Sequence, residues 1–104
     1  MQIDKHREEN RETLTLTGRL DTISAPLLLA ALEEDAAGIT EIIFELAGLE
    51  YVSSAGLRVF LIVHKKMAGY GGKMVLRQVT AEVMDILNMT GFSQFLAIEK
   101  PDAA

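Results

Sequence analysis

Two neighbouring serines, Ser53 and Ser54, lie within the segment LEYVSSAGLRVF, between an apolar run typical of a strand and an apolar run typical of a helix. A hydroxyl at the start of a helix can cap it, because the first backbone N–H groups have no partner inside the helix. We therefore predict that Ser53 is the cap and that Ser54, the first helical residue, points to solvent. A phosphate on Ser54 would lie at the positive end of the helix, which favours an anion. From the residues alone, such a pair is more often a cap and its neighbour than a regulatory site.

A nucleophilic serine is the second chemistry to consider at this turn. The segment VSSAG does not fit the G-x-S-x-G pattern of the hydrolase elbow, and only His6 and His64 could supply an imidazole base. The absence of cysteine removes thiolate nucleophiles and cysteine-based metal sites, and a lone histidine makes no metal site. We expect a protein without catalytic activity, cofactor or metal, and keep a serine-nucleophile enzyme as an alternative.

The composition indicates one acidic domain. The chain has 104 residues, 49% of them hydrophobic, which suffices for a single core. Its net charge of -5 disfavours nucleic acid and membrane surfaces as partners. The N-terminal segment is charged where a secretory signal needs an apolar core, and no apolar run approaches the roughly 20 residues that span a bilayer. We expect a cytoplasmic protein with a single domain over residues 1–104, in which residues 1–11 and 100–104 are loose ends.

Strand and helix patterns alternate along the chain. Leucine and threonine alternate over residues 12–17, which predicts a strand, and the run ITEIIFELAGL is apolar enough for a strand in the middle of a sheet. Helices are predicted after Ser24, which would cap residues 25–37, after Ser53 and after Thr80. KMVLRQV and QFLAIEK supply two later strands. This order predicts an α/β fold with a mixed β-sheet of about four to five strands and crossover helices.

Several other residues have both a structural and a functional interpretation. Asp21 could position a basic group or a nucleotide-bound metal of a partner, although an aspartate at such a place more often organises its own turn. Gly56 could admit the backbone of a partner or relieve crowding in the first helical turn. Arg58 is a candidate polar contact at the rim of a docking surface. We expect Glu45 to face solvent at a strand end and His64 to be an ordinary helix residue.

Three segments together carry a resemblance to a known family: GRLD at residues 18–21, IIFELAGLEYVSSAGLRVF at 42–60 and VMDILNMTGFSQFL at 83–96. They resemble the STAS domain family, and within it the bacterial anti-sigma-factor antagonists. The second segment is the most specific of the three. The resemblance implies a single STAS-like domain whose sheet is edged by helices, and in which the helix after the serine turn belongs to a docking face.

The resemblance also implies a regulatory function. In the family, the serine of a D-S-(S/T/A)-G-L motif is phosphorylated by a partner that is both a GHKL-type serine kinase and an anti-sigma factor. The unphosphorylated form binds that partner and releases a sigma factor, and a PP2C-like phosphatase removes the phosphate. Ser54 matches the phosphorylated serine, with Ser53 as the alternative acceptor, although Ser53 stands where the motif has its acidic residue. The implied partner-binding residues are Asp21, Ser53, Ser54, Gly56, Leu57 and Arg58. A constitutive STAS scaffold, not regulated by phosphorylation, is the alternative function.

Overall fold

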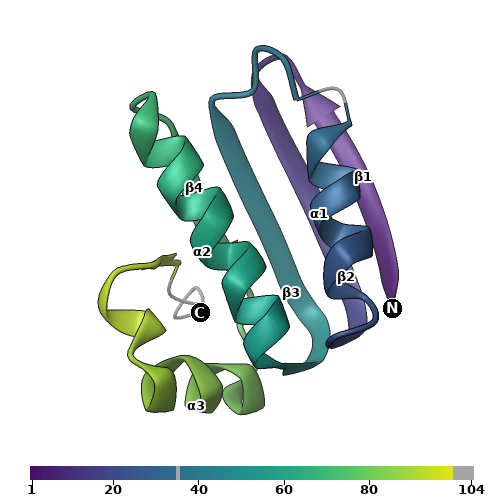
Figure 1. Cartoon of the computed structure of the whole chain (residues 1–104), viewed down its shortest axis with the longest axis vertical. Coiled ribbons are helices and arrows are strands. Elements are labelled where there is room, and N and C mark those ends of the chain that lie inside the picture. The colour runs from purple at the N-terminus through teal and green to yellow at the C-terminus, as the bar shows by residue number, and fades with distance from the viewer. Residues whose placement is uncertain (35, 100–104) are drawn as a thin grey trace, which may run out of the picture.

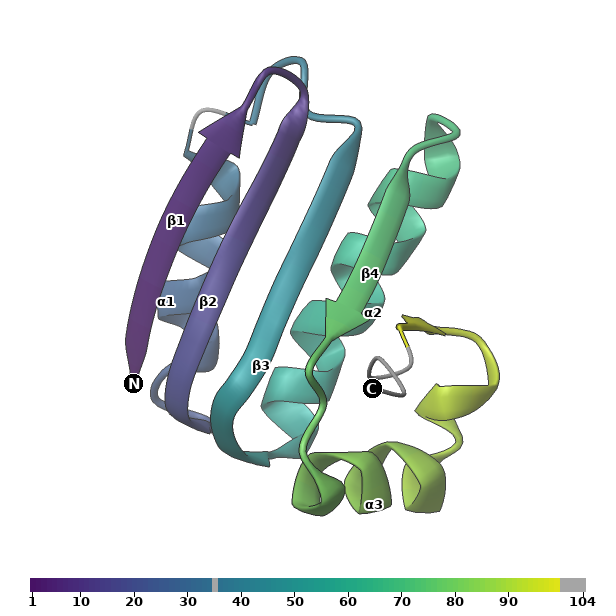
Figure 2. The same ribbon diagram turned by 180° about the vertical axis from the view of Figure 1, so that it is seen from behind.

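The fold consists of a five-stranded sheet with two helices side by side on one face (Figure 1). The computed structural model describes residues 1–34 and 36–99. Helices α1 and α2 lie side by side on the sheet in Figure 1, and Figure 2 shows no helix across the opposite face of the strands. The elements, in chain order, are β1 Gln2–Glu8, β2 Arg11–Leu20, α1 Ala25–Glu33, β3 Glu41–Val52, α2 Ser54–Gly69, β4 Lys73–Arg77, α3 Ala81–Thr90, the 3-10 helix η1 Phe92–Gln94 and β5 Ala97–Ile98.

The sheet is mixed and its strands follow the order of the chain. The order is β1-β2-β3-β4-β5, in which β1 runs antiparallel to β2 and the other neighbours pair in parallel. Parallel neighbours need a crossover, and α1, α2 and α3 with η1 supply the three connections. Strand β3 lies in the centre, as its apolar run predicts. The predicted α/β fold with four to five strands and crossover helices is confirmed.

The N-terminal residues, which we expected to be a loose end, form the edge strand β1. This expectation was wrong, because charged side chains are common on edge strands, where they oppose aggregation. Ile3 packs against the core, and Lys5 donates from Nζ to the carbonyl oxygen of Glu34 at 2.8 Å. The corresponding expectation for residues 100–104 lies outside the described residues.

Helix α1 is shorter than predicted. It ends at Glu33 rather than at residue 37, and Glu34 is already extended. Ala37 lies close to β1, because the Arg7 guanidinium donates to its carbonyl oxygen at 2.9 Å. Ser24 precedes the helix without capping it through its side chain, because its hydroxyl oxygen accepts from the backbone N–H of Asp21 at 2.9 Å and its proton points to the carbonyl oxygen of Arg19 at 2.8 Å. The start of this helix was therefore predicted correctly, but its end and its cap were not.

The core lies mainly between the sheet and helices α1 and α2. Phe44 of β3 and Phe60 of α2 are fully buried and their ring centroids are 5.1 Å apart. Leu14 and Leu16 point from β2 into the same core, as the alternation of leucine and threonine predicts. Within residues 1–34 and 36–99, no helix is both long and apolar enough to cross a bilayer.

Gly56 permits the closest approach between α2 and the sheet. A Cβ atom built there would lie 2.7 Å from Cγ of Leu20 and 2.9 Å from Cγ1 of Val52. Both neighbours are buried, so neither side chain can move aside without disturbing the core. Of the two interpretations of Gly56, the structure supports relief of crowding, here against the protein's own sheet.

The Gly56→Ala substitution should therefore destabilise the domain. Overpacking at this contact should lower the free energy of unfolding by about 1–3 kcal/mol, in spite of the better helix propensity of alanine. Gly69→Ala is the matched control on the same helix, because a Cβ at Gly69 meets nothing within 4 Å. Urea unfolding of both variants measures the difference, and equal stability of the two would contradict the close approach.

Candidate phosphorylation and docking site

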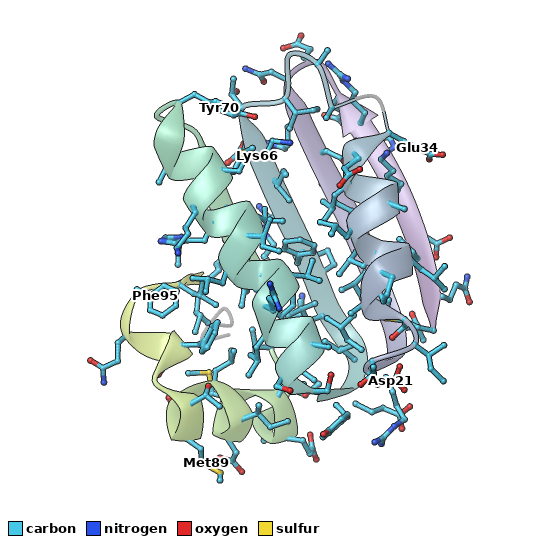
Figure 3. The ribbon with its side chains drawn as sticks, viewed as in Figure 1. Asp21, Glu34, Lys66, Tyr70, Met89 and Phe95 are labelled. Atoms are coloured by element: carbon cyan, nitrogen blue, oxygen red, sulfur yellow. The ribbon has the colours of Figure 1, made fainter. Side chains whose placement is uncertain are left out.

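The predicted site residues gather at the edge of the sheet where the parallel strands end. Asp21 follows β2 and Ser53 follows β3, and the backbone N–H of Ser53 donates to the carbonyl oxygen of Leu20 at 2.8 Å. Helices α1 and α2 both begin at this edge, and the label of Asp21 in Figure 3 marks it. Carboxyl ends of parallel strands are a common location for functional groups in α/β folds.

Ser53 is the N-cap of α2, as predicted. Its backbone is extended, with φ -84° and ψ 175°, and its hydroxyl oxygen accepts from the N–H of Gly56 at 3.3 Å. Ser54 is the first residue of the helix and is exposed. The hydroxyl of Ser54 is therefore open to an incoming protein, while that of Ser53 is engaged in the cap.

Asp21 organises the turn between β2 and α1. Its Oδ1 atom accepts from the backbone N–H groups of Ile23 and Ser24, both at 3.0 Å, and from the Ser24 hydroxyl at 3.1 Å. The hydrogen bond from the Ser24 N–H, more than any other contact, holds the pKa of the Asp21 carboxyl below its ordinary value. The interpretation of Asp21 as a turn organiser is confirmed.

The remaining predicted contacts divide between the core and the surface. Gly56 and Leu57 are buried and face the sheet, so they position α2 and offer no surface to a docked protein. Arg58 is exposed, one turn beyond Ser54. Ser54 and Arg58 are thus the predicted contacts on α2 that a partner can reach.

Two exposed apolar side chains that follow Asp21 in the chain were not predicted. Ile23 is 81% exposed and Leu27 is 59% exposed, both near the start of α1. On α2, Ile62 is 39% exposed and follows Ser54 and Arg58 at successive spacings of four residues, which places the three on one stripe of the helix. We call these five residues the serine face. The run of three leucines at residues 27–29 was the available signal, since three consecutive residues of a helix cannot all face one core.

Glu45 and His64 lie away from the serine face. Glu45 does not simply face solvent, as we had expected, because the register places it beside Arg77, whose guanidinium contacts it at 3.3 Å. His64 is an ordinary helix residue that packs against Phe95, with ring centroids 5.3 Å apart. Within residues 1–34 and 36–99, no group of three or more His, Asp or Glu side chains is arranged to hold a metal ion.

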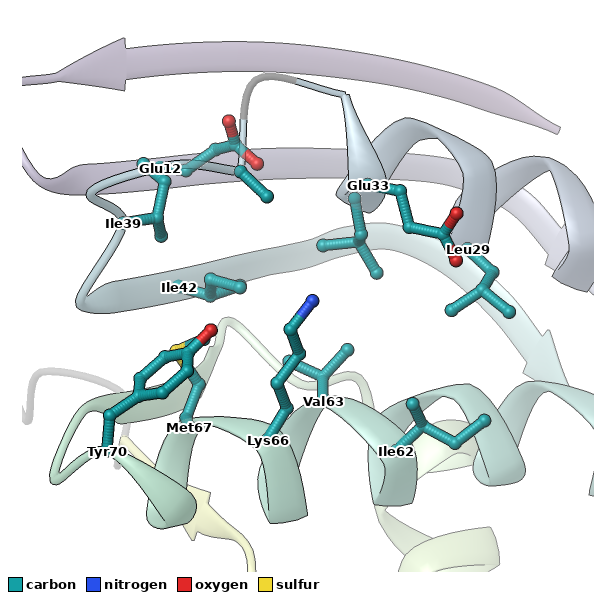
Figure 4. A pocket seen from close by; sticks show the side chains of 12 residues that line it. Glu12, Leu29, Glu33, Ile39, Ile42, Ile62, Val63, Lys66, Met67 and Tyr70 are labelled. Carbon is teal, nitrogen blue, oxygen red and sulfur yellow. The ribbon is translucent and has the colours of Figure 1, made fainter.

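A small apolar pocket opens between α1 and α2 at the other end of α2. Its volume is about 70 Å³, and Lys66 and Tyr70 flank it (Figure 4). Lys66 is twelve residues after Ser54, which corresponds to about 18 Å along the helix. The flanking residues Lys66 and Tyr70 are therefore remote from Ser54, although Ile62 of the serine face also lines the pocket.

The match to a family model covers nearly the whole chain. The model of the STAS domain matches residues 2–101. The chain therefore belongs to the STAS domain family, and the earlier resemblance is confirmed.

Similar proteins include antagonists of anti-sigma factors. The anti-sigma-B factor antagonist of Bacillus subtilis is 26% identical over 96 residues, which cover 92% of this chain and 88% of the relative. BtrV of Bordetella bronchiseptica, which is named as an anti-sigma factor antagonist, is 36% identical over 55 residues. That match covers 53% of this chain and 47% of BtrV, so it spans about half the length of the relative.

Solved structures agree with the fold. The unphosphorylated form of the anti-sigma factor antagonist SpoIIAA superposes with a TM-score of 0.77 at 16% identity, over 96% of this chain and 89% of SpoIIAA. The phosphorylated form of SpoIIAA, from Bacillus, gives a TM-score of 0.75 at 14% identity, over 97% of this chain and 94% of SpoIIAA. The arrangement of sheet and helices is thus that of this family.

Substitution of each serine should distinguish the capping role of Ser53 from the exposed hydroxyl of Ser54. Ser53→Ala removes the acceptor for the Gly56 N–H and should lower the free energy of unfolding by about 1 kcal/mol. Ser54→Ala removes an exposed hydroxyl and should change that free energy by less than about 0.5 kcal/mol. Urea unfolding of both variants tests the assignment, and a larger loss for Ser54→Ala would reverse it.

The turn at Asp21 should make stability depend on pH. Because the folded-state pKa of Asp21 lies below the ordinary value of 3.8, its ionised form stabilises the fold above that value, and the contribution is lost as pH falls through the folded-state pKa. The difference in unfolding free energy between the wild type and Asp21→Ala should be constant from neutral pH to about pH 5 and should shrink in more acidic solution. A difference that is independent of pH would contradict this role of the carboxylate.

Proposed function

We propose that this protein is an anti-sigma factor antagonist controlled by phosphorylation of Ser54. In its unphosphorylated form it binds an anti-sigma factor that is also a GHKL-type serine kinase, and this binding releases a sigma factor in the cytoplasm. A PP2C-like phosphatase restores the unphosphorylated form. The observation that carries the proposal is the exposed hydroxyl of Ser54 at the start of α2, in a chain whose relatives include the anti-sigma-B factor antagonist of Bacillus subtilis.

Ser54 is the proposed acceptor because its hydroxyl is accessible and has no structural task comparable to that of Ser53. In the reaction, Ser54 Oγ bonds to the γ-phosphorus of ATP, the bond to the β,γ-bridging oxygen breaks, ADP leaves, and the hydroxyl proton is released. The product carries about -1.5 to -2 charges beside the helix N-terminus, where the dipole favours an anion. The phosphate therefore leaves the domain folded.

The serine face is the proposed docking surface. Ile23 and Leu27 offer apolar area, while Ser54 and Arg58 offer polar contacts next to it. Exposed apolar side chains together with polar ones are typical of protein interfaces. Gly56 and Leu57 support this surface from within the domain.

A phosphate on Ser54 would oppose docking at this surface. An interface that covers Ser54 has to desolvate the new charge, and burial of an unpaired charge is costly. A loss of only about 1.4 kcal/mol weakens binding tenfold. Phosphorylation at this place therefore acts as a switch on the interaction.

We further propose that the domain has no catalytic activity of its own. His64 lies ten residues after Ser54 on the same helix, about 15 Å along its axis, and so cannot act as its general base. His6 pairs in register with Thr13, near the beginning of β2, whereas Ser54 follows the end of β3, which is parallel to β2. Both imidazoles are therefore remote from the hydroxyl.

Phosphorylation by a cognate anti-sigma factor kinase tests the proposal. Incubation with the kinase and ATP should give one phosphoserine in the wild type and in Ser53→Ala, and none in Ser54→Ala. The phosphorylated domain should bind the kinase at least tenfold more weakly than the unmodified domain in calorimetry. Phosphate on the Ser54→Ala variant would contradict the choice of acceptor.

Binding without phosphate control would instead favour a constitutive STAS scaffold. Ser53, at the position of the motif's acidic residue, is the observation behind this second candidate. In that case the domain would bind its partner with the same affinity whether or not Ser54 carries a phosphate.

A further inference from the structure

Arg58 differs from the other arginines in its surroundings. Arg11 donates to Glu41 at 2.6 Å, Arg77 contacts two glutamates, and Arg19 lies 4.3 Å from the ring centroid of Tyr51. Arg7 donates to backbone carbonyl oxygens. Across residues 1–34 and 36–99, no hydrogen bond or ion pair engages Arg58. Its guanidinium therefore carries a full charge into solvent at the serine face.

The spacing between Ser54 and Arg58 suits an ion pair along the helix. Both residues are exposed, and side chains four residues apart on a helix are neighbours, with Cβ atoms about 5–6 Å apart. An acidic group that precedes a basic one by four residues is the favourable order, because it also agrees with the helix dipole. A guanidinium can donate two parallel hydrogen bonds to a phosphate.

We propose that Arg58 is the intramolecular partner of the phosphate on Ser54, so that phosphorylation both adds a negative charge to the serine face and withdraws its free guanidinium from an incoming protein. This inference rests on the proposed phosphorylation of Ser54. It gives Arg58 two states, one available to an acidic group of the partner and one held by the phosphate.

The charges around Ser54 favour an orientation of the phosphate toward Arg58. Asp21, on the adjacent turn, carries a negative charge and already accepts three hydrogen bonds through Oδ1. Glu82 and Asp85 lie on α3, which starts near the beginning of α2 in Figure 1. All three repel a phosphate. The Arg19 guanidinium, whose charge acts on Asp21, lies over the ring of Tyr51, whereas Arg58 is on the same helix as Ser54 and attracts the phosphate.

Two consequences for binding follow from this pair. The unphosphorylated domain loses affinity for its partner when Arg58 is replaced, because a donor is removed from the docking surface. The phosphorylated domain has already lost that donor, so the same replacement affects it less. Arg58 therefore widens the difference in affinity between the two forms.

Phosphorus-31 NMR of the full chain tests the pair without any kinase. Phosphoserine is introduced at position 54 during synthesis of the wild type, Arg58→Gln, Arg58→Lys and Lys65→Gln. The second pKa of phosphoserine is about 6, and an ion pair with the dianion lowers it. Relative to the wild type, Arg58→Gln should raise the phosphate pKa by about half a unit. Arg58→Lys should raise it by less, since lysine keeps the positive charge but cannot donate two parallel hydrogen bonds.

Lys65→Gln is the matched control. It removes the same charge from an exposed position of α2 about 16 Å from Ser54 along the helix and should leave the phosphate pKa unchanged. Equal pKa values in all four proteins, or equal shifts in Arg58→Gln and Lys65→Gln, would overturn the pair. Because the phosphate is built in, this result is independent of the kinase experiment: failure of a kinase to modify Ser54 would contradict the proposed function, and not the pairing of the two side chains.

Discussion

The contact of Gly56 with Leu20 and Val52 determines how α2 lies on the sheet. There is no room for a Cβ atom between the helix and these two side chains, so the observed orientation of the first turn of α2 requires glycine at this position. That orientation directs Leu57 and Phe60 into the core, and it directs Ser54 and Arg58 outward. The accessibility of the proposed phosphorylation site thus follows from a packing constraint on the opposite side of the same helical turn.

The residues that stabilise the local backbone differ from the residue proposed for regulation. The hydroxyl of Ser53 satisfies an N–H group of the helix, and the carboxylate of Asp21 satisfies two N–H groups of the adjacent turn. Both are needed for the local backbone structure, while Ser54 carries no such task. An anion near a helix N-terminus contributes about 0.3–1 kcal/mol in its favour, so a phosphate on Ser54 need not be compensated by changes in the core. The unfavourable effect of the phosphate is confined to the binding of a partner that covers Ser54.

Many of the helices, strands and caps could be predicted from the sequence, because each depends on a short stretch of residues. The caps Ser53 and Thr80 and the apolar run of β3 each depend on a few neighbouring residues. The predictions that were wrong or missing depend on distant parts of the chain. Strand β1 forms because β2 offers a free edge, and Glu45 is paired because the register brings Arg77 beside it.

The exposed apolar residues could not be predicted for a related reason. Which of the three consecutive leucines of α1 is buried depends on where the sheet lies under the helix, and only Leu28 is fully covered, whereas Leu27 is exposed. Ile23 belongs to a turn whose shape is set by Asp21. The location of the serine turn was thus predictable from sequence, and the apolar surface around it was not.

The central claim is that a phosphate at this position changes the surface of the domain and leaves its fold intact. The most direct measurement is a comparison of amide chemical shifts between the unmodified chain and the chain with phosphoserine at position 54. We predict shift changes limited to the first two turns of α2 and the turn around Asp21, with the signals of β4 and the pocket between α1 and α2 unchanged. Changes spread through the sheet and the core would contradict it.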